Sequence, residues 1–155
     1  MRIFAIAILT AAAASPAGSD PAGFELWKSG DLQAFEQKLA PKMNAHKVAT
    51  EALGSYGNHS FLMAHREGSG EAELHETQAD VMVIESGEAT LVVGGTVVDP
   101  KTTAPHEIRG PSIKGGEKKS LAAGDVVHIP VKVPHQMLVE SGKQITYFVV
   151  KIEAR

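Results

Sequence analysis

The sequence predicts a single all-β domain, a sandwich or a barrel, with one short helix near its N-terminus. Many short segments rich in β-branched residues follow one another after residue 46. Glycine-rich turns separate these segments, among them Gly68-Ser69-Gly70, Gly94-Gly95 and Gly115-Gly116. Repeated short strands joined by tight turns are typical of sandwiches and barrels. A chain of 155 residues is long enough for one such domain and too short for two.

The expected strands share β-branched or aromatic residues and end at turn residues. They are Lys47 to Leu53, His59 to Glu67, Glu71 to His75, Asp80 to Ser86, Glu88 to Val93, Thr96 to Val98, Glu107 to Ile113, Glu117 to Leu121, Asp125 to Pro130, Pro134 to Glu140 and Gln144 to Glu153. Before them, Ser29 is suited to cap a helix, and apolar residues recur at helical spacing until Pro41. This pattern predicts a helix over residues 30–40 whose apolar side packs on the domain.

The first residues have the form of a signal peptide. Arg2 precedes an apolar, alanine-rich run from Ile3 to Ala14, and small residues follow it. The run is about a dozen residues, whereas a membrane-spanning helix needs roughly 20. We therefore expect cleavage after Ala14 or Ala17 and a periplasmic or secreted protein, with a buried N-terminal helix as the alternative. The expected organisation is a signal peptide (1–17), an N-terminal extension with the helix and first strand (18–55) and a main domain (56–155).

The composition limits the partners. The net charge is -3, with 21% charged residues and no basic stripe, so nucleic acid is not the expected partner. No basic amphipathic helix follows the leader, which argues against membrane binding after cleavage. The chain has no cysteine, which excludes disulfides and a lipid-modified cysteine. A small-molecule ligand or substrate fits this composition better.

Two motifs carry a family resemblance. The first is Gly70-x2-Glu73-x-His75-x4-Asp80-x6-Gly87, and the second is Gly124-x5-Pro130-x-Lys132-x2-His135. Together they resemble the paired motifs of the cupin superfamily, in particular its small single-domain members. The resemblance implies a double-stranded β-helix, or jelly-roll barrel, over most of the mature chain. It also implies a divalent metal in the barrel and a homodimer.

The resemblance assigns the candidate metal ligands by position. With the gap to Gly87 held fixed, His75 takes the place of the second histidine of the first motif, Glu73 that of the first histidine, and Asp80 that of the glutamate. His135 is the histidine of the second motif. Such a set suits Fe, Mn, Zn, Ni or Co without selecting one. The alternatives are two unrelated histidines, an exposed Glu73, and an Asp80 that only holds a water or another ligand.

Strand alternation predicts which side chains share a face. Residues 73 and 75 are two apart, so both point into the barrel. By the same rule, a mainly apolar pocket would be lined by Met82, Ile84, Met137 and Val139, with Gln78 as a further contact. His65 and Tyr147 are weaker candidates for an acid, a base or a substrate contact, with core positions as the alternative.

Two further features have open interpretations. The segment from Asp99 to Ser112, with three prolines and Lys101, His106 and Arg109, is expected to be either a lid over the cavity or a solvated loop. The strand from Asp80 to Ser86 is apolar on both faces, so a second chain or the N-terminal helix should cover its outer face.

Two classes of function fit these observations. The first is a metal-dependent enzyme acting on a small organic molecule, of the oxygenase type or of the isomerase, lyase or hydrolase type. The second is a binding or sensing module that holds a sugar or an organic acid without turnover. Fold alone does not separate them.

Overall fold

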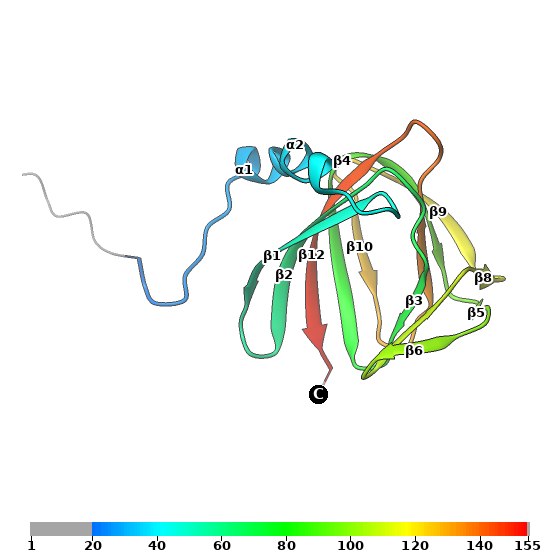
Figure 1. Ribbon diagram of the computed structural model, residues 1–155. Coiled ribbons are helices and arrows are strands. Elements are labelled where there is room, and N and C mark those ends of the chain that lie inside the picture. Colours follow the sequence, from blue (N-terminus) through cyan, green and yellow to red (C-terminus); the bar gives the residue numbers. More distant parts are fainter. Residues whose placement is uncertain (1–19, 155) are drawn as a thin grey trace, which may run out of the picture.

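The computed structural model describes residues 20–154, so the predicted signal peptide lies outside the described residues. An antiparallel sheet curls around the interior of the domain, and the helical segment lies across one side of it (Figure 1). The strands are β1 (Val48–Ser55), β2 (His59–Arg66), β3 (Ala72–His75), β4 (Gln78–Val93), β5 (Thr96–Val97), β6 (Lys101–Ala104), β7 (Glu107–Gly110), β8 (Ile113–Lys114), β9 (Glu117–Ala122), β10 (Val126–Ile129), β11 (His135–Leu138) and β12 (Ile145–Glu153). The predicted all-β jelly-roll architecture is confirmed.

Strand β4 joins the two halves of the barrel. Its first half pairs with β12 and β10, and its second half pairs with β11 and β9. The sequence predicted two strands separated at Gly87, but the ladder continues through this residue. Gly87 has φ 78°, and a Cβ there would lie 2.0 Å from the carbonyl oxygen of Gln144. Glycine therefore lets β4 turn from one half to the other while contacting the neighbouring chain.

The predicted helix is present as two short helices, α1 (Ser29–Gln33) and α2 (Phe35–Leu39), followed by a 3₁₀ turn (Ala40–Lys42). Phe35 and Leu39 are buried against Ala49 and Met63 on the outer side of β1 and β2. This contact removes apolar surface from water on the outer face of the sheet. The helical segment thus covers β1 and β2, and it reaches β4, the strand whose cover the sequence left undecided, where the Ser86 hydroxyl donates to Glu36 at 2.6 Å.

The main core fills the interior between the two halves of the barrel. It is built from the side chains of β4, β11 and β12 that point inward, which are alternate residues along each strand. Its buried members include Met82, Ile84, Leu91, Leu121, Ile129, Met137, Val139, Ile145, Tyr147 and Val149. This core occupies one part of the interior and leaves the other part to polar side chains.

The segment from Asp99 to Ser112, for which the sequence predicted a strand starting at Glu107 within a lid or a solvated loop, forms a hairpin of β6 and β7. Strand β7 pairs with β3 along four residues, so the hairpin extends the sheet at its edge. Strand β6 was not predicted, because Pro100 and Pro105 flank it and proline cannot donate to a ladder. As a result, the hairpin forms a wall of the interior beside His75.

Within residues 20–154, no helix combines the length and the apolar character that crossing a membrane requires.

Candidate metal centre

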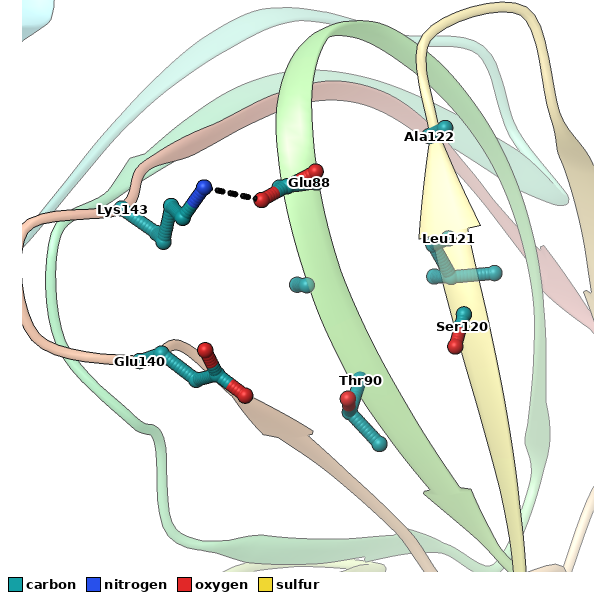
Figure 2. Close-up of a pocket in the computed structure, with 8 residues that line it drawn as sticks. Glu88, Thr90, Ser120, Leu121, Ala122, Glu140 and Lys143 are labelled. Atoms are coloured by element: carbon teal, nitrogen blue, oxygen red, sulfur yellow. Dashed lines mark ion pairs between the residues drawn. The ribbon is translucent and has the colours of Figure 1, made fainter.

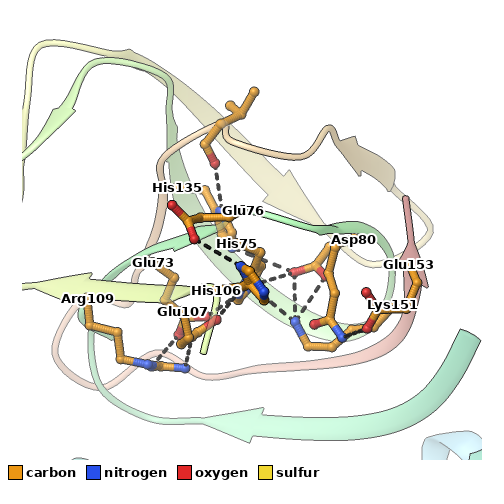
Figure 3. Close-up of polar contacts among 12 residues, drawn as sticks. Glu73, His75, Glu76, Asp80, His106, Glu107, Arg109, His135, Lys151 and Glu153 are labelled. Atoms are coloured by element: carbon orange, nitrogen blue, oxygen red, sulfur yellow. Dashed lines mark hydrogen bonds and ion pairs between the residues drawn. The ribbon is translucent and has the colours of Figure 1, made fainter. Parts of the chain in front are cut away.

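Three potential metal ligands meet on two paired strands. Glu73 and His75 lie on β3, and His135 opens β11, directly opposite Glu73 in the antiparallel register. One potential ligand atom from each of the three side chains lies within 4.8 Å of the other two. Two atoms bound to one ion at about 2.1 Å lie at most about 4.2 Å apart, so small side-chain movements would bring the three atoms onto a single ion. The structure thus brings together three of the four predicted ligands (Figure 3).

Hydrogen bonds orient both imidazoles so that their Nε2 atoms face the centre. His75 bonds the Glu107 carboxylate through Nδ1, and His135 Nδ1 donates to the carbonyl oxygen of Val133 at 3.2 Å. Such outer partners fix the tautomer and the direction of metal-binding histidines. Burial lowers the pKa of His135, so this ring is neutral at neutral pH.

The Nε2 atom of His135 is a buried polar atom without a hydrogen-bond partner among the described residues. A buried lone pair with no partner is costly and uncommon. Because it points at the place where Glu73 and His75 converge, a cation at this place would satisfy it. The residues present therefore fit a divalent metal.

Glu73 has one oxygen engaged and one directed inward. Its Oε1 accepts from Arg109 Nη1 at 2.9 Å and lies 3.6 Å from Arg66 Nη2. Its Oε2 lies 3.7 Å from His75 Nε2. The two arginines hold the carboxylate in place and leave Oε2 directed at the cluster.

Asp80 lies beside this cluster and has a partner of its own. Lys151 is opposite Asp80 in the pairing of β12 with β4, and Lys151 Nζ donates to both carboxylate oxygens at 3.0 and 3.2 Å. Asp80 Oδ2 also lies 3.3 Å from His75 Nε2 and 3.7 Å from His135 Nε2. Burial disfavours the ionised carboxyl, but His75 and Lys151 lower the pKa of Asp80. The fourth predicted ligand is therefore held as an ion-pair partner of a lysine.

The Nε2 atom of His75 is the point at which several cations compete. Lys151 Nζ is 3.1 Å from it, a hydrogen bond that requires an unprotonated Nε2. Burial opposes protonation of His75, but Asp80 and Glu107 raise its pKa to about 9. The single lone pair of Nε2 can therefore bind one of three partners: a proton that is then donated to Asp80, the ammonium of Lys151, or a metal ion.

The site opens into a cavity of about 610 Å³, a size typical for a small organic ligand. Of the predicted pocket residues, Met82, Gln78 and Tyr147 line this cavity. Met137 lies in a small hollow beside His135, whereas Ile84 and Val139 are part of the main core. The cavity wall is thus more polar than the apolar alternation of the strands predicted.

Arg66 and Arg109 stand between this cavity and a second one. Arg66 Nε donates to the hydroxyl of Tyr147 at 2.8 Å, and Arg109 Nη2 pairs with Glu107 Oε1 at 2.7 Å. Both arginines also line a neighbouring cavity of about 410 Å³ that includes His46 and Gln136. The two side chains therefore form a partition between the two spaces. Burial raises the pKa of Tyr147, which keeps its hydroxyl protonated.

Of the two alternatives for His65, a cavity contact or a core position, the structure agrees with the core position. The cavity is lined by the alternate residues of β2, Leu62, Ala64 and Arg66. His65 points to the opposite, helix-covered side, where its Nδ1 bonds the hydroxyl of Thr146 at 2.8 Å. Apolar residues occur on both sides of strand β2, so the alternation of apolar and polar residues could not identify its inner side.

Sequence reasoning missed three site residues: Lys151, Glu107 and Arg66. Lys151 and Glu107 lie on strands that pair with the motif strands β4 and β3 through long-range contacts, and Arg66 lies on β2, which pairs with β12. The available signal was the alternation of side chains along the strand. Lys151 is two residues from Val149 and four from Tyr147, and both of these also line the cavity. Glu107 and Arg109 alternate in the same way on β7.

A further hollow of about 290 Å³ lies on the barrel over β4 and β9, as Figure 2 shows. Its charged groups are Glu88, Lys143 and Glu140, and the first two form an ion pair at 2.6 Å. Lys143 and Glu88 are both more than half exposed, so water screens this pair. This hollow offers no convergent ligand set comparable with that of Glu73, His75 and His135.

No protein-family model matches the sequence, and no curated protein matches it. Solved structures do match the fold. The protein named TT1209 from Thermus thermophilus superposes with a TM-score of 0.55 and 20% identity, covering 77% of this chain and 94% of that one. A cupin-2 domain protein from Rhodospirillum rubrum superposes with a TM-score of 0.52 and 17% identity, covering 71% and 62%. The chain has the cupin fold.

The polyketide cyclase RemF from Streptomyces resistomycificus shares this cupin fold, with a TM-score of 0.50 and 15% identity over 71% of this chain and 68% of that one. Enzymes are thus among the proteins with the same architecture. At these identities the comparisons establish the fold and leave the function to the site.

Proposed function

We propose that this protein binds one divalent metal ion through Glu73, His75 and His135 and acts on a small organic molecule in the adjoining cavity. The observation that carries the proposal is the buried Nε2 of His135, which lacks a hydrogen-bond partner within the part of the chain described here and faces two further ligand atoms. Bound there, a divalent ion would supply Lewis-acid chemistry or, as iron, oxygen chemistry.

The charges of the cavity wall indicate the class of substrate. Three cationic side chains, Arg66, Arg109 and Lys151, are balanced by three carboxylates, Glu73, Asp80 and Glu107. A divalent ion added to this balanced set leaves a net positive charge in a partly enclosed space. An organic anion, such as a carboxylate or an enolate, therefore fits the loaded site better than a neutral molecule.

The chain's own residues would orient this substrate. Met82, Leu62 and Val149 give the cavity an apolar side, and Lys151 and Arg109 lie on its polar side. A carboxylate with an apolar body can satisfy both sides at once. This arrangement supports isomerase, lyase or oxygenase chemistry on an organic acid.

Reconstitution tests the metal part of this proposal. Protein purified without chelator, stripped and then loaded separately with Fe²⁺, Mn²⁺, Zn²⁺, Ni²⁺ and Co²⁺, is expected to bind about one ion per chain by elemental analysis. The matched comparison is His128→Ala, because His128 is an exposed histidine of β10 outside the cluster. Less than about a tenth of an ion per chain with every metal would rule out the proposal.

A metal-free binding module is the second candidate function. It is favoured by Lys151, which already places a cation against His75 and Asp80. In this case the cavity would bind a sugar or an organic acid without turnover. Tight binding of such a ligand to stripped protein, with no gain on adding metal, would favour this function over the enzyme.

We also propose that the protein is exported to the periplasm or secreted, and that it forms a homodimer. The apolar run of residues 3–14 supports export, and the strand from Asp80 to Ser86, which is apolar on both faces, supports the dimer. The N-terminal residue of protein recovered outside the cytoplasm should follow residue 14 or 17. The mass in solution should be twice that of one processed chain.

A further inference from the structure

A lysine occupies the side of the candidate metal centre that the sequence motifs do not describe. Lys151 Nζ lies 3.1 Å from His75 Nε2, and this nitrogen is the ligand atom that His75 would offer to a metal. The same ammonium donates to both oxygens of Asp80 at 3.0 and 3.2 Å. Lys151 is thus fixed at a metal ligand by a buried carboxylate.

A pyridine-type nitrogen has one lone pair in the plane of its ring. That pair can accept a hydrogen bond from Lys151 or bind a metal ion, but it cannot do both. A metal ion bound within about 2.1 Å of His75 Nε2 would also lie close to the ammonium, and like charges at such distances repel strongly in a partly buried site. Binding of the ion therefore requires Lys151 to release His75.

We propose that Lys151 is a built-in competitor of the metal ion: in the metal-free protein it holds the form of His75 whose Nε2 carries no proton, the form that a metal also needs, and it must withdraw from that nitrogen before the ion binds. This inference rests on the proposed function, because it takes Glu73, His75 and His135 as the ligands. In this proposal Asp80 is not a fourth metal ligand, and its carboxylate instead holds Lys151 beside His75.

The structure gives Lys151 room to withdraw. Its side chain is 22% exposed and lines the cavity of about 610 Å³, whereas the Asp80 carboxylate is 2% exposed. A flexible four-carbon stem can move the ammonium along the wall while one oxygen of Asp80 remains its partner. The cost of breaking the contact with His75 then lowers the net affinity for the ion, so the competitor sets the metal concentration at which the site fills.

The test is the affinity of stripped protein for the metal alone, measured by calorimetric titration at one fixed pH with the ion that binds best in the reconstitution experiment. Lys151→Met removes the ammonium and keeps the apolar stem, so the dissociation constant should fall about tenfold to a hundredfold. Lys151→Gln, whose amide can still donate to Asp80, should shift the constant in the same direction by less. Lys143→Met, at an exposed lysine paired with Glu88, should leave it unchanged.

A purely structural role for Lys151 predicts the opposite sign, because loss of its contacts would disorder His75 and weaken binding. Unchanged or weaker binding in both variants therefore overturns the competition. If the wild-type protein binds an ion and the variants bind it no better, this inference fails alone. If none of these proteins binds an ion, the proposed function fails with it.

Thermal melting provides a second measurement that does not depend on activity. Without metal, Lys151→Met should melt below the wild-type protein, because the buried Asp80 loses its partner. With saturating metal, the rise in melting temperature should be larger for the variant than for the wild-type protein. An equal or smaller rise contradicts the proposal.

Discussion

Two buried histidines, His65 and His75, lie on opposite sides of the β-sheet wall and have different surroundings. His65 is 1% exposed under the helix-covered side, where its near polar neighbours are the hydroxyl of Thr146 and, at 3.5 Å, the half-exposed carboxylate of Glu67. His75 is 5% exposed and lies between Asp80, Glu107 and Lys151 in a cavity. Burial alone therefore does not distinguish a structural histidine from a ligand, whereas convergent charge and an open cavity do.

The largest expected effect is on metal binding when His135 is truncated. His135→Ala should lower metal affinity on the order of a thousandfold, because a change in an outer partner already costs about tenfold to a hundredfold and this change removes a ligand. Calorimetric titration measures the affinity, and circular dichroism checks that the fold is retained. His65→Ala is the matched control for the comparison. An equal loss of metal affinity in His65→Ala would contradict the distinction between a structural histidine and a metal ligand.

The next effect is the pH dependence of stability in the metal-free protein. The folded pKa of His75, about 9, is above the unfolded value of 6.5. Its contribution to the free energy of unfolding is therefore fully present below pH 6.5 and is lost as the pH rises through 9, by on the order of 3 kcal/mol. Urea unfolding at a series of pH values measures this loss. His75→Gln should flatten the curve in this window, and an unchanged slope would assign the loss to other groups.

A smaller effect is expected from the outer partner of His75. Glu107→Gln keeps the shape of the side chain but removes the charge that orients the imidazole, so metal affinity should fall about tenfold to a hundredfold. Glu117→Gln, at an exposed carboxylate of β9, serves as the control. Equal affinities in the two variants would mean that Glu107 does not position the ligand.

The smallest effect concerns the histidine on the helix-covered side. Thr146→Val removes the hydroxyl that bonds His65 Nδ1, which should lower the free energy of unfolding by about 1 to 2 kcal/mol. Metal affinity should be unchanged, because neither residue lines the cavity. A change in affinity above about threefold would show that the two sides of the wall are coupled.

The fold and the core of the site were accessible from the sequence because their signals are local. Strand alternation and turn glycines gave the elements, and motif spacing brought Glu73, His75 and His135 together. Lys151 could not be found in this way, since its position opposite Asp80 depends on the pairing of β12 with β4, 71 residues apart along the chain. For the same reason the sequence left the position of His65 open, because Met63 and Ala64 on β2 suit either side of the sheet.

The partition of Arg66 and Arg109 also limits the length of a ligand. Both side chains line the two adjoining cavities, so the boundary between these spaces consists of long, rotatable groups. Such a boundary can open by changes of side-chain rotamer without movement of the strands. A compact substrate would use only the space beside His75, whereas an elongated one would have to displace an arginine from Glu73. The length of a bound ligand and the position of Glu73, a proposed metal ligand, are thereby linked through the same two ion pairs.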